Sequence, residues 1–186
     1  MAMTGVDGLQ YAILSKDDVT GVTYGEFVKV PGTVKIDVKP ASNSASIYAD
    51  NAPYATATSL GDIDVEIELA NFTLEDQAAL LGHKVDAKGV MVSAADDIAP
   101  YTCFAFRGLK DNDKYMYVKL LKGKFQEPET SNETKGDSPK FGTATLKGKF
   151  VARTYDKAWK RVLDADAKGY TAGDETAFMA SVEPKA

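Results

Sequence analysis

The stretch Leu60–Phe72, LGDIDVEIELANF, decides the fold that the sequence predicts. Within it, aliphatic and acidic residues alternate without interruption: Asp62, Ile63, Asp64, Val65, Glu66, Ile67, Glu68 and Leu69. A strict period of two is typical of a β-strand with one buried face and one solvated face. We therefore expect a strand that lines a core on its aliphatic side and presents a column of carboxylates on the other.

An earlier stretch, Thr33–Lys39 or TVKIDVK, alternates in the same way. Its aliphatic residues point to one side, while Lys35, Asp37 and Lys39 point to the other. If this strand pairs beside Leu60–Phe72, its lysines partly neutralise the column of carboxylates. Two lysines against five carboxylates still leave an excess of three negative charges on the face.

The period changes directly after the acidic strand, which predicts one helix at about residues 73–82. Thr73 with Asp76 three positions later approximates a capping box, and Gly82 supplies a stop. Apolar residues recur at helical spacing between them, at Leu74, Ala78 and Leu81. This apolar stripe predicts contact with the core.

Strand-like segments dominate the rest of the chain. A second, short C-terminal helix is expected at about residues 157–168, with Asp156 as its cap and Gly169 as its stop, and the tail beyond it is expected to hold a further helical turn. The sequence thus predicts a single α+β domain over residues 1–186, mostly β, with an antiparallel sheet. The predicted strands include GLQYAIL (8–14), YTCFAFRG (101–108), YMYVKLLKGKF (115–125) and TATLKGKFVART (143–154).

The segment at about residues 41–59, ASNSASIYADNAPYATATS, is built from small and polar residues. It carries Tyr48 and Tyr54, and Asp50 with Asn51 marks a turn at its middle. A segment of this length without a clear period is too long for an ordinary turn. We expect it to be either mobile or functional.

Composition narrows the class of function. The formal net charge is −5 and the isoelectric point is about 5.0, which argues against tight sequence-independent DNA binding. The sequence lacks the long apolar run of a membrane span, and its first residues show no secretion signal. Globular proteins commonly have such proportions of hydrophobic (44%) and charged (26%) residues.

Cysteine and histidine, which serve in many catalytic and metal sites, are scarce in this chain. The chain has one cysteine, Cys103, expected as a small buried hydrophobe, and one histidine, His83, expected as a partner of a helix C-terminus. Glycosidase chemistry needs two carboxylates in different environments, whereas the acidic column shares one environment. We therefore predict no catalytic residues, no metal site and no cofactor.

The string KGKF occurs twice, at Lys122–Phe125 and at Lys147–Phe150. Paired lysines beside an aromatic residue suit either a nucleic-acid patch or two strands under the same local constraint. The net negative charge of the chain and the lack of aromatic residues beyond the one Phe in each string favour the interpretation as two strands. A register that matches Glu127 to Thr143 would place Gly123 opposite Lys147.

Several stretches in this order resemble a known family. The combination comprises Y-x-DN (48–51), the acidic strand, a helix ending in LLG (80–82), KGKF-x-x-P (122–128) and TKGDS (134–138). It is similar to the major tail proteins of long-tailed, non-contractile bacteriophages that infect Gram-positive hosts. The resemblance runs from about Leu9 to the Trp159 segment and leaves the tail after Lys168 unmatched.

The resemblance implies a virion protein, assembled in the host cytoplasm, that forms stacked hexameric rings around the path of the ejected genome. It implies an antiparallel β-sandwich or barrel-like tail-tube fold, an inter-ring loop at about 41–59 and a C-terminal arm at about 169–186. Its partners would be itself, the tape measure protein, and the tail terminator and tail tip proteins, with DNA passing through without specific binding. Contacts of the loop would include Tyr48, Asp50, Asn51 and Tyr54.

The resemblance also suggests a role for the charged residues. The acidic face of Asp62, Asp64, Glu66 and Glu68 would line the lumen and repel DNA, or would meet lysines at subunit contacts. The candidate basic residues for such contacts are Lys122, Lys124, Lys147 and Lys149. Two other classes stay open: a tail terminator or head-completion ring protein, and a carbohydrate-binding or adhesion β-sandwich.

Overall fold

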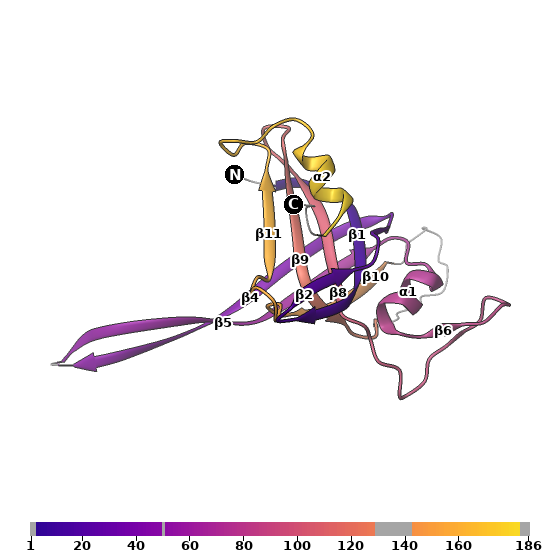
Figure 1. The fold of residues 1–186 in the computed structure, drawn as a ribbon, viewed down its shortest axis with the longest axis horizontal. Helices are drawn as coiled ribbons and strands as arrows, with labels where there is room; N and C mark the ends of the chain where they lie inside the picture. The colour runs from indigo at the N-terminus through magenta and orange to yellow at the C-terminus, as the bar shows by residue number, and fades with distance from the viewer. Residues whose placement is uncertain (1–2, 50, 129–142, 183–186) are drawn as a thin grey trace, which may run out of the picture.

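The computed structural model describes residues 3–49, 51–128 and 143–182. In this part of the chain a nine-stranded antiparallel sheet curls into a half-barrel, with two short helices beside it (Figure 1). The prediction of a mostly β, barrel-like antiparallel fold is confirmed. The elements are β1 (Met3–Asp18), β2 (Gly21–Tyr24), β3 (Val28–Lys29), β4 (Thr33–Ala49), β5 (Ala52–Leu69), α1 (Leu74–Leu81), β6 (Lys84–Val85), β7 (Met91–Val92), β8 (Thr102–Lys110), β9 (Tyr115–Phe125), β10 (Ala144–Phe150), β11 (Lys160–Asp164) and α2 (Asp174–Ala180).

The main sheet follows the order β2-β1-β8-β9-β10-β5-β4, with β3 on β1 and β11 on β9. The short connection between β3 and β4 draws the two ends of this path together. Val30 donates its backbone N–H to the carbonyl of Leu9 in β1, and Gly32 accepts from Ala70 just after β5. These links join β1 to the end of β5 across the curled sheet.

The aliphatic face of β5 lies in the main core, as its alternation predicts. Ile63, Val65, Ile67 and Leu69 are each at most 2% exposed. They pack with aromatic residues of β8, β9 and β10, including Phe104, Phe125 and Phe150. Cys103 is also fully buried, which confirms the expectation of a small buried hydrophobe.

Helix α1 has the predicted bounds and caps. The Thr73 hydroxyl accepts from the backbone N–H of Asp76, and Gly82 adopts a left-handed conformation with φ of 81°. The predicted apolar stripe is wrong in part, because Leu74 is 44% exposed whereas Leu80 is buried. The helix is rotated so that Asp76 faces inward, where its carboxylate accepts from the Tyr11 hydroxyl at 3.1 Å.

The helix predicted at about residues 157–168 is wrong, because this segment contains strand β11. Its residues pair with Met116–Leu120 of β9, which supplies backbone partners that a helix would leave unused. Lys157 has a positive φ of 58°, and Asp156 binds the buried guanidinium of Arg153 instead of capping a helix. Tertiary pairing thus overrides weak helical propensity here.

The C-terminal tail does hold a further helix, α2, between Gly173 and Ser181. None of the α2 residues is buried, so the helix is attached mainly through the residues at its C-terminal end. Val182 fills a small second core with Ala12, Cys103 and Leu121, on the opposite face of the sheet from the main core. The expected C-terminal arm is therefore folded back on the sheet as far as residue 182.

The segment at about 41–59, which showed no clear period, forms the distal halves of β4 and β5. The two strands stay paired from Thr33 with Leu69 to Ala49 with Ala52 and extend beyond the body as a two-stranded ribbon (Figure 1). Every side chain described between residues 41 and 60 is exposed. We call this ribbon, residues 41–60, the hairpin arm.

Candidate functional site

The first candidate surface is the outer face of β5, where the predicted acidic column is present. Asp62 and Asp64 have side chains 63% and 61% exposed, and Glu66 is 41% exposed. Lys35 and Lys39 of β4 flank the column on one side, as the sequence predicts, with Lys39 3.3 Å from Glu66.

Strand β10 adds a second row of lysines on the other side of the column. Lys149 lies 3.2 Å from Asp62 and 3.8 Å from Asp64, and Lys147 is opposite Glu66 in the register. These carboxylates raise the pKa of Lys149, chiefly through the hydrogen bond to Asp62. The expected excess of three negative charges falls to one, so the face is a mosaic of both signs.

The two KGKF strings pair as antiparallel neighbours, which confirms the structural interpretation. The expected register is wrong by three positions, because Gly148 lies opposite Phe125 and Phe150 lies opposite Gly123. A Cβ added to Gly123 would lie 2.4 Å from Phe150 Cγ, and one added to Gly148 would lie 2.7 Å from Phe125 Cδ1. Each glycine thus makes room for the phenylalanine of the other copy.

The KGKF lysines lie on the opposite face from these rings, and each has neighbours in its own chain. Lys122 Nζ is 2.6 Å from the Asp17 carboxylate, and both side chains are largely buried. Burial would raise the pKa of Asp17, but hydrogen bonds from Lys122 and Thr154 and the backbone of Tyr155 outweigh it and hold the pKa well below its usual range.

Lys124 lies next to Lys122 on this face, and its Nζ is 4.6 Å from the centre of the Tyr101 ring. Lys122 approaches the same ring at 4.8 Å. These are cation–π contacts within one chain. A role of Lys122, Lys124, Lys147 and Lys149 at subunit contacts stays a prediction, to which Lys122 is least suited because of its buried ion pair.

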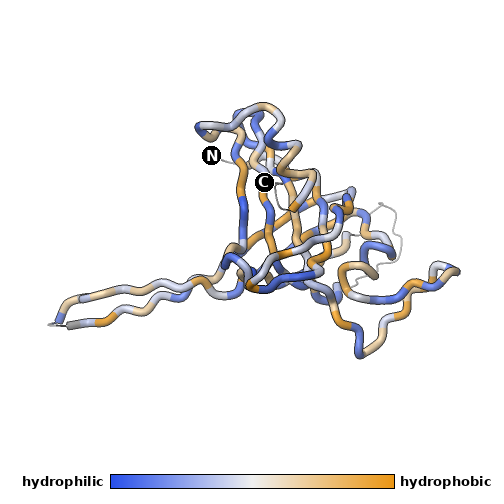
Figure 2. The backbone as a smooth tube through the Cα atoms, in the orientation of Figure 1, coloured by the Kyte–Doolittle hydropathy of each residue, from blue (hydrophilic) through white to orange (hydrophobic). Residues whose placement is uncertain are grey.

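The second candidate surface is the hairpin arm, where three of the four expected contact residues are described. Tyr48 and Tyr54 are 69% and 79% exposed, and Asn51 takes a positive φ of 61° in the turn. Asp50 lies outside the described residues. Figure 2 colours most of the arm pale or orange, because small, uncharged residues of intermediate hydropathy dominate it.

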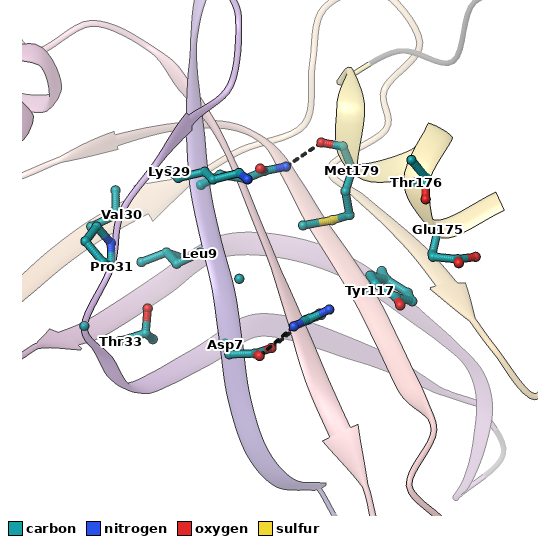
Figure 3. A pocket seen from close by; sticks show the side chains of 14 residues that line it. Asp7, Leu9, Lys29, Val30, Pro31, Thr33, Tyr117, Glu175, Thr176 and Met179 are labelled. Atoms are coloured by element: carbon teal, nitrogen blue, oxygen red, sulfur yellow. Dashed lines mark hydrogen bonds and ion pairs between the residues drawn. The ribbon is translucent and has the colours of Figure 1, made fainter. Parts of the chain in front are cut away.

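The third candidate surface is a cavity of about 580 Å³ beside the connection between β3 and β4. Figure 3 shows Val30, Pro31 and Thr33 on one side, with Tyr117 and α2 opposite. Between them, Asp7 of β1 lies opposite Arg107 of β8 and accepts two hydrogen bonds from its guanidinium, at 2.6 and 2.8 Å.

An irregularity in β1 shapes this cavity. The pairing of β1 with β8 shifts between Asp7 and Gln10, and Gly8 within the shift has a φ of 65°. Gln10 then reaches α2, donating from Nε2 to the Met179 carbonyl at 2.6 Å. Sequence patterns missed this site because its walls come from segments far apart in the chain. The local signal is Gly8, which is the first residue of the strand predicted at 8–14.

His83 is not a helix partner as expected. Its Nδ1 lies 2.8 Å from an Asp97 oxygen and its Nε2 lies 2.9 Å from a Glu127 oxygen, so that it bridges two loops. The hydrogen bond to Asp97 contributes most to raising the pKa of His83 above its ordinary value, and the hydrogen bond to Glu127 contributes next.

In the described ranges, no group of three or more His, Cys, Asp or Glu residues could hold a metal ion. Within the same ranges, both helices are too short to cross a membrane. Comparison of the chain with protein-family models and with curated proteins finds no match.

Proposed function

We propose that this chain is a structural subunit that assembles into stacked hexameric rings and forms the tail tube of a long-tailed bacteriophage. The resemblance in sequence suggests the family, and the hairpin arm is the observation that carries the proposal. Assembly partners beyond the chain itself would be the tape measure, terminator and tail tip proteins. The genome would pass through the tube without specific binding.

The arm supports assembly because it is poorly stabilised by its own chain. A two-stranded ribbon without a core is at best marginally stable in water. The arm nevertheless exposes Ile47, Tyr48, Tyr54 and Leu60, at 67%, 69%, 79% and 47%. Burial of these side chains against another molecule would offset the cost of ordering the ribbon.

The open half-barrel supports the same conclusion. Strand β4 ends the path of the sheet, so its outer edge has no partner strand within the described residues. Folded proteins usually protect or pair such an edge. Contacts between different surfaces of neighbouring copies generate closed rings or extended filaments, and a tube of stacked rings uses both.

The mosaic of charge on β5 and its neighbours fits a surface that DNA passes without adhering. Lysines that are already paired to carboxylates in the same chain have less to gain from phosphates. We retain the proposal that Asp62, Asp64, Glu66 and Glu68 face the lumen, with lysines at the same face limiting the repulsion. The alternative, that these acids lie at subunit contacts, makes a different prediction for charge reversal.

Negative-stain electron microscopy of the purified protein, over a range of concentrations, tests the proposal. Long tubes of constant diameter with sixfold end views are expected. Rings that never stack would favour a terminator or head-completion protein instead. A protein that stays monomeric and binds in a glycan screen would favour the adhesion sandwich.

A further inference from the structure

We propose that the cavity beside β1 and α2 receives the tip of the hairpin arm of a second copy of this chain. The inference rests on the proposed function, since it names where the arm docks in the assembly. The tip is defined by Ile47, Tyr48 and Tyr54, and the cavity by Asp7, Thr33, Arg107, Tyr117, Thr176 and Met179.

The positions of the two surfaces suit a head-to-tail contact. Thr33, the first residue of β4, lines the cavity, and Ala49, the last residue of β4, lies at the end of the arm. At a rise of ~3.3 Å per residue, the strand separates them by roughly 50 Å. An arm therefore cannot reach the cavity of its own chain (Figure 1), and pairing between copies propagates in one direction.

The four charged side chains that line the cavity, Asp7, Lys29, Arg107 and Glu175, carry two charges of each sign, so a charged ligand is not required. The Arg107 guanidinium is held by both oxygens of Asp7. Glu175 accepts from the Tyr170 hydroxyl at 2.6 Å. Leu9 and Val30 contribute apolar wall.

The chemistry of the arm matches such a cavity. From residue 41 to residue 60 the sequence contains a single charged residue, Asp50, which lies outside the described residues. Tyrosine combines a large apolar ring with one polar group, and a buried tyrosine hydroxyl usually finds a hydrogen-bond partner. The side chains of Thr33 and Tyr117 could supply that partner at the cavity wall.

The volume of the cavity and the charge on the outer face of β5 both favour the cavity as the docking site of the tip. A volume of about 580 Å³ falls within the range of ~300–1,000 Å³ that accommodates small ligands, so it has room for side chains of the tip. Docking on the charged face of β5 would instead remove water from ion pairs such as Lys149–Asp62, which is costly. The described residues of the arm carry no charge, so they offer these ion pairs no compensating interaction.

Helix α2 forms one wall and is attached to the body at its C-terminal end. Gln10 binds the Met179 carbonyl, and the buried ammonium of Lys119 donates to the Ser181 carbonyl at 2.7 Å. The helix itself buries none of its side chains. Its first turn can therefore shift to admit a ring while these anchors hold.

Cross-linking tests the contact directly. The double variant Ala55→Cys with Thr176→Cys keeps both tyrosines and places one thiol on the arm and one in the cavity. The native Cys103 is fully buried and does not compete. Treatment with a short bis-maleimide should give a ladder of covalent species beyond two chains on a denaturing gel. The control pair Ala55→Cys with Val19→Cys, whose second site is 81% exposed at a distant turn, should give no ladder.

Microscopy of the same samples separates this inference from the proposed function. A ladder with tubes supports both, and a ladder without tubes supports the docking and overturns the tube. Tubes without a ladder overturn the docking alone. Neither ladder nor tubes overturns both.

A second variant blocks the cavity without touching the arm. Thr176→Trp should raise the concentration needed for assembly by roughly tenfold or more, since a bulky ring would occupy the space of the tip. Ala177→Trp on the same helix, which does not line the cavity, is the matched control. Assembly of Thr176→Trp at the wild-type concentration would overturn the proposal.

Discussion

Gly123 and Gly148 occupy the same place in the two copies of KGKF, and each lies against the phenylalanine of the other copy. The rings of Phe125 and Phe150 meet edge to face with centroids 5.7 Å apart. A side chain larger than hydrogen at either glycine would enter one of these rings. The repeat is thus a packing solution used twice across one strand pair, with its lysines on the outer face.

Replacement of Gly123 by alanine should destabilise the protein by about 1–3 kcal/mol, because overpacking forces a core ring to move. Urea denaturation followed by tyrosine and tryptophan fluorescence measures the loss. Gly5→Ala is the matched control, since a Cβ there meets only Leu109 Cβ at 3.9 Å within a strand. Equal stability of Gly123→Ala and Gly5→Ala would contradict the packing argument.

The bridge from His83 to Asp97 and Glu127 should make stability depend on pH near neutrality. The folded state raises the pKa of His83, so its contribution is complete below the unfolded value of ~6.5. That contribution is lost as the pH rises through the folded-state pKa. The difference in denaturation midpoint between the wild type and His83→Gln should therefore be largest near pH ~6 and shrink at higher pH.

A difference that stays constant from pH ~6 to ~9 would show that His83 acts through packing alone. Asp97→Asn provides the companion measurement, because it removes one partner of the imidazole and leaves Glu127 in place. It should reduce the pH dependence without abolishing it.

At the scale of elements, α1 is defined by its ends. Thr73 and Gly82 cap it as predicted, and Gly82 also lies where a Cβ would be 2.4 Å from the Ile98 carbonyl oxygen. A side chain at this position would therefore lower the free energy of unfolding for two separate reasons. The backbone is left-handed, and the added Cβ would clash with the neighbouring loop.

Gly82→Ala compared with Gly89→Ala separates these costs. Both glycines have a left-handed backbone, with φ of 81° and 78°, but a Cβ at Gly89 meets nothing within 4 Å. Gly89→Ala should cost about 1–2 kcal/mol from the backbone alone. Gly82→Ala should cost clearly more in the same denaturation assay, and equal losses would rule out the clash.

The predictable elements are those whose sequence signals, such as alternation or helix caps, lie within one continuous segment. The alternation identifies the inner half of β5, and the caps of α1 determine its bounds, because the buried face and the stop signals are adjacent in sequence. The start of β5 at Ala52 was not predicted. The outer face of β5 was predictable for the same reason. Its neutralisation by Lys147 and Lys149 was not, since it depends on which strand lies alongside.

The elements that were not predictable depend on distant partners. The β11 segment has helical spacing, yet the open edge of β9 holds it as a strand. The hairpin arm lacks a period because both of its faces are exposed, so burial imposes no pattern on it. The cavity brings Asp7 and Arg107 together across a strand pairing that no local motif indicates.

At the scale of the whole molecule, charge reversal distinguishes a lumen from an interface. The double variant Asp64→Lys with Glu66→Lys turns the mosaic face positive, so DNA should adhere to it. Under the proposed function, phage carrying it should form normal tubes and eject their genome more slowly, as followed by the fluorescence of a DNA-binding dye. Failure of the variant to form tubes would place these acids at subunit contacts instead.

The hairpin arm contributes none of its described residues to either core. Tyr48→Ala with Tyr54→Ala should therefore leave the unfolding free energy within about 0.5 kcal/mol of the wild type, as exposed surface substitutions usually do. Assembly should be lost or shifted to much higher concentration, as measured by sedimentation and microscopy. Tyr155→Ala, an exposed tyrosine at 51% outside the arm, is the control. Unimpaired tubes from the double variant would mean that the ribbon projects from the assembly without holding it together.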